Sequence, residues 1–125
     1  MSPSKRKIII VDDEPIIRIS LELVLRKHGY EVNSFKNAEL ILPLIPKNDA
    51  HLFIIDLELP GINGQELAQK IIEQKPASKI IFLTGFDLSE SQLNPDISNV
   101  YRLMHKPVDI DQLLHSIREA METEQ

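Results

Sequence analysis

Short apolar runs recur along the chain at wide spacing, and longer stretches of mixed polarity separate them. The runs cover residues Lys7–Val11, Tyr30–Ser34, His51–Ile55, Lys79–Leu83 and Val100–Met104. The first, third and fourth runs are rich in Ile, Leu, Val and Phe without alternation, which is typical of strands buried on both faces of a parallel sheet. The second run mixes polar and apolar residues, as an edge strand does.

The stretches between these runs carry the spacing of amphipathic helices. Helical stripes of apolar residues cover Pro15–His28, Asn63–Lys75 and Asp109–Met121. A helix within Ala38–Pro46 is expected to be short or distorted, because Pro43 interrupts it. The fourth connection contains Pro95 and is expected to hold only one or two helical turns, near Ser89–Leu93. The alternation of strands and helices predicts an α/β fold with a parallel sheet and right-handed crossovers.

Length and composition narrow the class of protein. The chain has 125 residues, a net charge of −5 and no cysteine, so we expect one domain without disulfides or thiolate metal sites. Its apolar runs are far shorter than the roughly 20 residues of a membrane helix, and its polar first residues do not form a secretory signal. An acidic chain is poorly suited to binding nucleic acid, because contacts with phosphates require a basic surface. We therefore expect a soluble cytoplasmic domain at residues 7–121, with tails at residues 1–6 and 122–125.

Polar residues of complementary chemistry follow four of the five apolar runs. Asp12 and Asp13 follow the first run, Asp56 follows the third, Thr84 the fourth and Lys106 the fifth. Ligands of open parallel sheets bind beyond the carboxyl ends of the strands, so these side chains are expected to meet at one edge. A single Asp after a strand is usually a solvated turn residue, but four complementary strand ends are much harder to explain in that way.

Three carboxylates in one crevice require a cation or raised pKa values. Two of them about 5 Å apart repel by about 3 kcal/mol at an effective dielectric constant of 20. Oxygen ligands without His or Cys favour a hard ion, Mg²⁺ before Ca²⁺ or Mn²⁺, which shares its remaining positions with water and phosphate oxygens. With Lys106 and Thr84 nearby, the crevice is interpreted as a metal-assisted phosphoryl site. Asp56 stands alone after a central strand and is the candidate acceptor, since carboxylates form acyl phosphates.

Four segments resemble the receiver domain of the two-component response regulator family. They are IIIVDDEP (Ile8–Pro15), LFIIDLELPGINGQEL (Leu52–Leu67), IIFLTGF (Ile80–Phe86) and HKP (His105–Pro107). Each motif alone is weak, but the four in this order are highly specific. The resemblance implies a flavodoxin-like, doubly wound sheet of five parallel strands in the order 2-1-3-4-5, with five helices.

The resemblance also implies roles for individual residues. Asp56 accepts a phosphoryl group from a phosphohistidine. Mg²⁺, for which Mn²⁺ can substitute, is bound by Asp13, Asp56 and the backbone carbonyl of Glu58, with Asp12 acting through a bound water. Lys106 pairs with the phosphoryl oxygens from beside a cis Lys106-Pro107 peptide bond, and the Thr84 hydroxyl moves to bond one of them.

The implied partners are a sensor histidine kinase or phosphotransfer protein and an output protein or an output domain not included in this chain. A dimer that forms on phosphorylation is also compatible with the resemblance. The domain acts as a signalling switch and promotes only its own phosphoryl transfer and autodephosphorylation. Phe86 lies two residues beyond Thr84, and we expect its bulky side chain to shield the site from water and so to slow autodephosphorylation.

One position departs from the family pattern. Leu103 lies three residues before Lys106, where the family usually carries the Tyr or Phe of a rotameric switch. Strand alternation places Tyr101 on the same face as Leu103 but about 6.6 Å further back, at ~3.3 Å per residue. Tyr101 is therefore expected to be a core residue and not a substitute for the missing aromatic side chain.

The residues also leave two alternative functions to consider. A Mg²⁺-dependent phosphohydrolase with an aspartyl nucleophile usually carries Asp-x-Asp, whereas this chain has Asp56-Leu57-Glu58, and the Asp12-Asp13 pair would be unexplained. A degenerate receiver that binds a protein constitutively would account for Leu103, but the intact acidic, hydroxyl and lysine positions argue against it.

Overall fold

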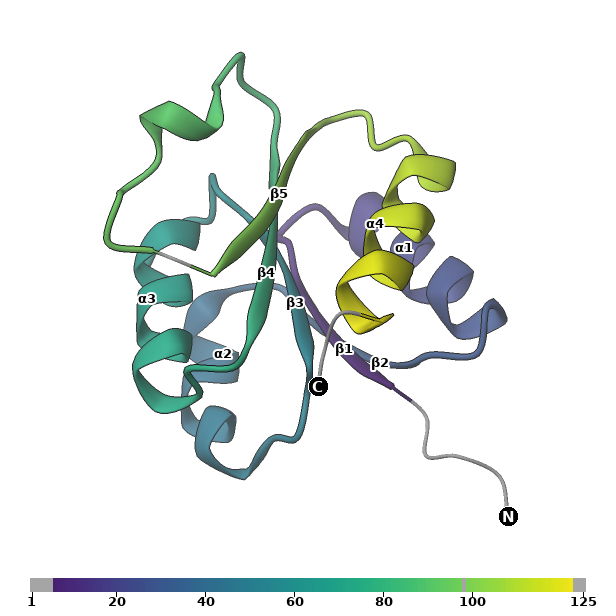
Figure 1. The fold of residues 1–125 in the computed structure, drawn as a ribbon, viewed down its shortest axis with the longest axis horizontal. Helices are drawn as coiled ribbons and strands as arrows, with labels where there is room; N and C mark the ends of the chain where they lie inside the picture. Colours follow the sequence, from purple (N-terminus) through teal and green to yellow (C-terminus); the bar gives the residue numbers. More distant parts are fainter. Residues whose placement is uncertain (1–5, 98, 123–125) are drawn as a thin grey trace.

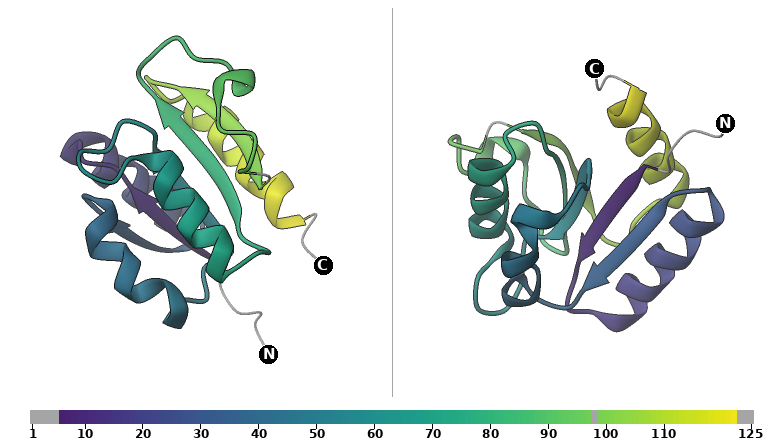
Figure 2. Two further views of the ribbon diagram at one scale, coloured as in Figure 1. Left: turned by 90° about the vertical axis from the view of Figure 1, so that its left-hand side faces the viewer. Right: turned by 90° about the horizontal axis from the view of Figure 1, so that it is seen from below.

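The structure, a computed structural model, describes residues 6–97 and 99–122. These residues form a five-stranded parallel sheet in the order β2-β1-β3-β4-β5, with helices on both faces (Figures 1 and 2). The strands are β1 (Lys7–Val11), β2 (Glu31–Phe35), β3 (Leu52–Asp56), β4 (Lys79–Thr84) and β5 (Val100–His105). The predicted fold class and strand order are confirmed.

Helices divide between the two faces of the sheet (Figure 1). They are α1 (Pro15–Lys27), α2 (Ala38–Ile41), α3 (Gly64–Gln74) and α4 (Ile110–Glu122), together with the 3₁₀ segments η1 (Leu42–Lys47) and η2 (Glu90–Gln92). Alternate residues of the central strands enter two separate apolar clusters. Ile8 and Ile10 pack with α1 and α4, whereas Ile9 and Val11 pack with α2 and α3. This alternation explains why the central strands are apolar at every position.

The expectation of five helices was wrong. The part of the chain that the structure describes contains four α-helices, and the connection between β4 and β5 holds only the single turn of η2, Glu90–Gln92. The polar segment around it offers few apolar residues for a buried helical face, and Pro95 cannot donate a backbone hydrogen bond. The prediction of a short or distorted second helix is confirmed. α2 ends at Ile41, and the 3₁₀ segment η1, which contains Pro43 and Pro46, follows it directly.

The start of α3 is defined by local hydrogen bonds and by a close backbone approach. The Asn63 side chain accepts a hydrogen bond from the Glu66 N–H, and the Glu66 side chain accepts one from the Asn63 N–H. Gly64 begins the helix directly behind Asp56, where a Cβ atom would lie 2.4 Å from the Asp56 carbonyl oxygen. Only glycine fits there, so this residue type allows α3 to pack against the carboxyl end of β3.

An irregularity in β5 corrects the prediction for Tyr101. Ile80 pairs with Val100 but Ile81 pairs with Arg102, so Tyr101 is an additional residue in the register. A bulge of this kind reverses the alternation of side chains. Tyr101 consequently packs on the face of α4, opposite to Leu103, and its hydroxyl donates a hydrogen bond to Glu119 at 3.3 Å. Its packing against the core is confirmed, but its predicted position on the face of Leu103 was wrong.

The predicted tails fall mostly outside the described residues, which exclude residues 1–5 and 123–125. At the carboxyl end, α4 continues through Glu122, one residue beyond the expected boundary at 121. The predicted cis peptide bond between Lys106 and Pro107 is present.

Candidate functional site

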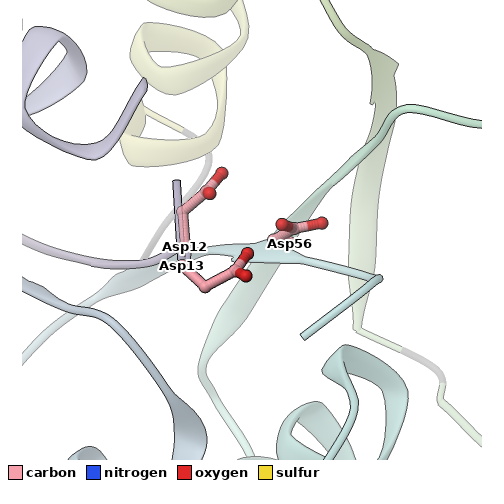
Figure 3. A group of neighbouring side chains, drawn as sticks. All are labelled: Asp12, Asp13 and Asp56. Atoms are coloured by element: carbon pink, nitrogen blue, oxygen red, sulfur yellow. The ribbon is translucent and has the colours of Figure 1, made fainter. Parts of the chain in front are cut away.

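Three aspartates meet at the carboxyl edge of the sheet (Figure 3). Asp12 and Asp13 directly follow β1, and Asp56 is the last residue of β3. One carboxylate oxygen from each lies within 4.8 Å of the other two. Asp12 and Asp56 are buried, with 0% and 2% of their surface exposed, whereas Asp13 is exposed. The predicted convergence is confirmed because β1 and β3 are adjacent, parallel and in register up to Val11 and Ile55.

Lys106 brings its ammonium into this acidic group from the segment after β5. Its Nζ lies 3.1 Å from Asp56 Oδ2 and 3.1 Å from Asp12 Oδ2, and it donates a hydrogen bond to the Glu14 carboxylate. Burial opposes the charge of this ammonium, but the Glu14 hydrogen bond and the two aspartates outweigh burial and hold the Lys106 pKa well above its ordinary value. Lys106 therefore remains a fixed cation against the carboxylate of Asp56.

The carboxylate of Asp12 lies in an electrostatically unfavourable environment. Burial, together with repulsion from Asp56, raises its pKa from 3.8 to about 6, although the Glu14 N–H and Lys106 act in the opposite direction. Its Oδ1 accepts a hydrogen bond from the Glu14 N–H at 2.9 Å. Its Oδ2 is buried and, within residues 6–97 and 99–122, accepts no well-directed hydrogen bond despite the nearby ammonium. A buried, incompletely satisfied carboxylate oxygen beside two further carboxylates fits a hard divalent cation.

Asp56 is held in place through the backbone of the following loop. Its Oδ1 accepts a hydrogen bond from the Glu58 N–H at 2.9 Å, and its Oδ2 faces Lys106. The next residue, Leu57, donates its N–H to the Leu83 carbonyl of β4 at 2.9 Å. Both oxygens of the buried carboxylate thus have fixed donors, and the loop that carries Glu58 is tied to the neighbouring strand.

Thr84 is fully buried at the end of β4. Its hydroxyl donates a hydrogen bond to Glu58 Oε2 at 2.6 Å and accepts one from the Phe86 N–H at 3.1 Å. The Gly85 N–H donates to the other oxygen, Glu58 Oε1, at 2.9 Å. The Glu58 side chain therefore links the loop after β3 to the end of β4.

Two side chains of the site were missed by the sequence reasoning. Glu14, which directly follows Asp12 and Asp13 in the sequence, was assigned no role, yet its carboxylate binds Lys106. Glu58 was considered for its backbone carbonyl, whereas its side chain holds Thr84 and Gly85. The acidic run after β1 was an available signal for Glu14. The contact of Glu58 spans 26 positions of sequence, and no local pattern reveals it.

Comparison with known proteins identifies the architecture. The response regulator receiver domain family matches residues 8–118. The chain belongs to this family. This receiver domain is 29% identical to sporulation initiation phosphotransferase F of Bacillus subtilis, over 90% of each chain. It is 27% identical to the response regulator protein PilR of Pseudomonas aeruginosa, of which it spans 26%.

Solved structures show the same fold. The receiver domain superposes on a CheY-like response regulator receiver protein from Methanospirillum hungatei with a TM-score of 0.89 and 30% identity, covering 97% of each chain. It superposes on the response regulator TrrA of Thermotoga maritima, crystallised with Mg²⁺ and BeF, with a TM-score of 0.82 and 32% identity, covering 92% of this chain and 98% of TrrA. The chain is therefore a signalling domain of the two-component type, and its acidic group suits a divalent cation.

Among the described residues of this receiver domain, every helix is too short or too polar to cross a lipid bilayer.

Proposed function

We propose that residues 7–121 form a phosphoacceptor switch in which Asp56 receives the phosphoryl group. The observation that carries this proposal is the 3.1 Å contact between Asp56 Oδ2 and the Lys106 ammonium, beside the carboxylates of Asp12 and Asp13. A lone carboxylate at the end of the central strand is the candidate nucleophile, and the groups around it are those that neutralise a phosphoryl group.

Asp13, Asp56 and the backbone carbonyl of Glu58 are the proposed direct ligands of Mg²⁺, with Asp12 acting through a bound water. Mn²⁺ is expected to substitute, because it accepts the same oxygen ligands. The bound ion supplies positive charge that stabilises the phosphoryl oxygens during transfer. The buried Oδ2 of Asp12 and the clustering of the three carboxylates support this assignment.

In the proposed transfer, an Asp56 carboxylate oxygen forms a bond to phosphorus as the P–N bond of a phosphohistidine breaks. The bonding pair remains on the imidazole nitrogen of the donor. Lys106, already charged and in contact with Asp56, moves from the carboxylates to the phosphoryl oxygens. The Thr84 hydroxyl turns toward one of these oxygens. Because Thr84 is the last residue of β4, the phosphoryl group, with its charge of about −2, alters the conformation at the end of this strand.

We infer that the donor is a protein, namely a sensor histidine kinase or a phosphotransfer protein. Ile16, Ile19 and Leu23 lie at helical spacing on one face of α1, the helix that follows Asp12 and Asp13, and they are 82%, 53% and 63% exposed. An apolar strip of this kind beside a charged site favours a protein surface as the partner. The output is carried by another protein or by an output domain, and a phosphorylation-dependent dimer is one form that this output can take.

The remaining parts of the proposal concern location and range of activity. A cytoplasmic location matches a cysteine-free chain, and a net charge of −5 disfavours direct binding to nucleic acid or to anionic lipid. Catalysis is proposed to be limited to the domain's own phosphoryl transfer and autodephosphorylation. An aspartyl phosphohydrolase usually carries Asp-x-Asp, whereas this chain has Asp56-Leu57-Glu58, and such an enzyme would leave the Asp12-Asp13 pair without a role.

The test is phosphorylation by acetyl phosphate in the presence of Mg²⁺, followed by intact mass spectrometry. One phosphoryl group is expected on the wild-type chain and none on Asp56→Asn. Asp49→Asn is a matched control, because Asp49 is an exposed aspartate that pairs with Lys7 away from the site. Equal phosphorylation of Asp56→Asn would refute the proposal, and steady turnover of simple phosphomonoesters would favour the phosphohydrolase.

A further inference from the structure

The Glu58 side chain holds the Thr84 hydroxyl, which is the proposed donor to a phosphoryl group on Asp56, and it also holds the neighbouring Gly85 N–H. One of its carboxylate oxygens accepts the Thr84 hydroxyl at 2.6 Å, and the other accepts the Gly85 N–H at 2.9 Å. The Thr84 hydroxyl has a single proton, and its oxygen already accepts the Phe86 N–H. Thr84 therefore cannot donate to a second acceptor while Glu58 is in place.

Glu58 is also coupled directly to the proposed phosphoacceptor. Its backbone N–H donates to Asp56 Oδ1 at 2.9 Å, while its side chain extends across to the end of β4. Leu57, between them in sequence, is fixed to the Leu83 carbonyl. The short segment after Asp56 thus carries a second carboxylate. This carboxylate holds the Thr84 hydroxyl and the Gly85 N–H, while Asp56 itself is bonded by the Glu58 N–H and by Lys106.

A carboxylate and a phosphoryl group are alike in charge sign and in their use of hydrogen-bond acceptors. On Asp56, a phosphoryl group carries a charge of about −2 in place of the single negative charge of the carboxylate, and it presents three acceptor oxygens. Placed on Asp56, it would repel the Glu58 carboxylate and compete with it for Thr84 and Gly85. Both anions cannot hold these donors together, so one of them must leave.

From this geometry we infer that the Glu58 carboxylate is a resident substitute for the phosphoryl group, which positions Thr84 in the unphosphorylated state and must be displaced for the switch to occur. The inference rests on the proposed role of Asp56 and adds a positioning residue to it. Displacement has a cost, because two charge-assisted hydrogen bonds are broken. Removing the Glu58 carboxylate should therefore strengthen the binding of a phosphoryl analogue, whereas loss of a merely structural contact would weaken it.

The experiment is a titration of the full chain with beryllofluoride at fixed Mg²⁺, followed by amide NMR. Glu58→Ala is expected to lower the midpoint about tenfold, since both competing bonds to an anion are lost. Glu58→Gln keeps the shape but has only one oxygen acceptor and no charge, so it is expected to lower the midpoint about threefold. Asp87→Ala is the matched control: it removes one negative charge from an exposed residue of the adjacent loop and should leave the midpoint within twofold of wild type.

The amide signal of Gly85 provides a second measurement. Its N–H donates to Glu58 in the starting state, so its proton resonance should shift in Glu58→Ala before any beryllofluoride is added. In wild type, the same resonance should move during the titration as the acceptor changes from carboxylate to beryllofluoride. An unchanged Gly85 resonance in Glu58→Ala would overturn the inference.

The outcomes separate this inference from the proposed function. If wild type does not respond, or if Asp56→Asn responds equally, the phosphoacceptor function is refuted. If wild type responds through Asp56 while both Glu58 variants keep its midpoint or bind more weakly, only the displacement of Glu58 is refuted. The same holds if Asp87→Ala tightens binding as much as Glu58→Ala, because a general effect of charge would then suffice.

Discussion

Replacing Asp12 with Asn tests the electrostatic account of the site most directly. In the absence of divalent cations, Asp12 is fully buried and its pKa is raised from 3.8 to about 6, chiefly by burial and with a contribution from Asp56. The ionised carboxylate therefore destabilises the folded protein at neutral pH. Asn is close in shape and keeps an oxygen for the Glu14 N–H, which now bonds Asp12 Oδ1, but it carries no charge.

The size and sign of the effect follow from the pKa. Each pKa unit corresponds to about 1.36 kcal/mol, so a change from 3.8 to about 6 amounts to about 3 kcal/mol. The pKa of Asp12 is higher in the folded state than in the unfolded state. The protonated side chain therefore lowers the stability of the fold little below about pH 4, and the full loss of stability is reached once the pH has risen through 6. Asn also lacks the attraction of Asp12 to Lys106, so we expect a net gain of about 1–3 kcal/mol in the variant above pH 7.

The assay is urea unfolding of wild type and Asp12→Asn in EDTA across a pH series. The advantage of the variant should increase by about 2 kcal/mol between about pH 4.5 and pH 8. Asp13→Asn is the matched control, since it removes the same charge from the exposed neighbour and should change the free energy of unfolding by less than about 1 kcal/mol. Millimolar Mg²⁺ should stabilise wild type more than Asp12→Asn and reduce the difference between them.

Two results would refute this reasoning. A variant that is less stable than wild type in EDTA at pH 8 would show that the buried carboxylate contributes net stability. An advantage that does not change with pH would show that Asp12 does not ionise in this range.

Three further predictions concern the metal, the loop after β3 and the lifetime of the phosphoryl group. Mg²⁺ at about ten times its Kd should add about 1.4 kcal/mol to the free energy of unfolding of wild type. Differential scanning calorimetry should show this as a rise in Tm. Equal stabilisation of Asp13→Ala by Mg²⁺ would contradict the metal assignment. Gly64→Ala should lower the free energy of unfolding in urea by about 3 kcal/mol, because the added Cβ would lie 2.4 Å from a carbonyl oxygen. Gly29→Ala should lower it by only about 1 kcal/mol, because Gly29 has a φ of +94° but no atom lies within 4 Å of the added Cβ. Similar losses in the two variants would contradict the steric argument. Phe86→Ala, which removes a ring that is 62% exposed beside the site, should release the phosphoryl group several-fold faster in a decay assay by mass spectrometry, and an equal or slower rate would refute shielding.

Much of the fold followed from local patterns. Runs without alternation marked β1, β3 and β4, which are almost entirely buried, since a strand covered on both faces must be apolar at every position. Asn63 caps α3 through the reciprocal hydrogen bonds with Glu66 that its residue type favours. The connection before β5 has no strong helical stripe, and its single turn, η2 (Glu90–Gln92), lies within the predicted segment Ser89–Leu93.

The order of residues along the chain places Asp12, Asp56 and Lys106 at the ends of strands, and parallel pairing brings them to one edge of the sheet. The environment of these groups, in contrast, depends on contacts between distant segments. The bulge that turns Tyr101 away from Leu103 arises in the pairing of β4 with β5, and the bond from Thr84 to Glu58 joins two loops that are distant in sequence. The physical reason is that strand and helix patterns reflect neighbours along the chain, whereas burial, register and hydrogen-bond partners depend on contacts between segments that meet only after folding.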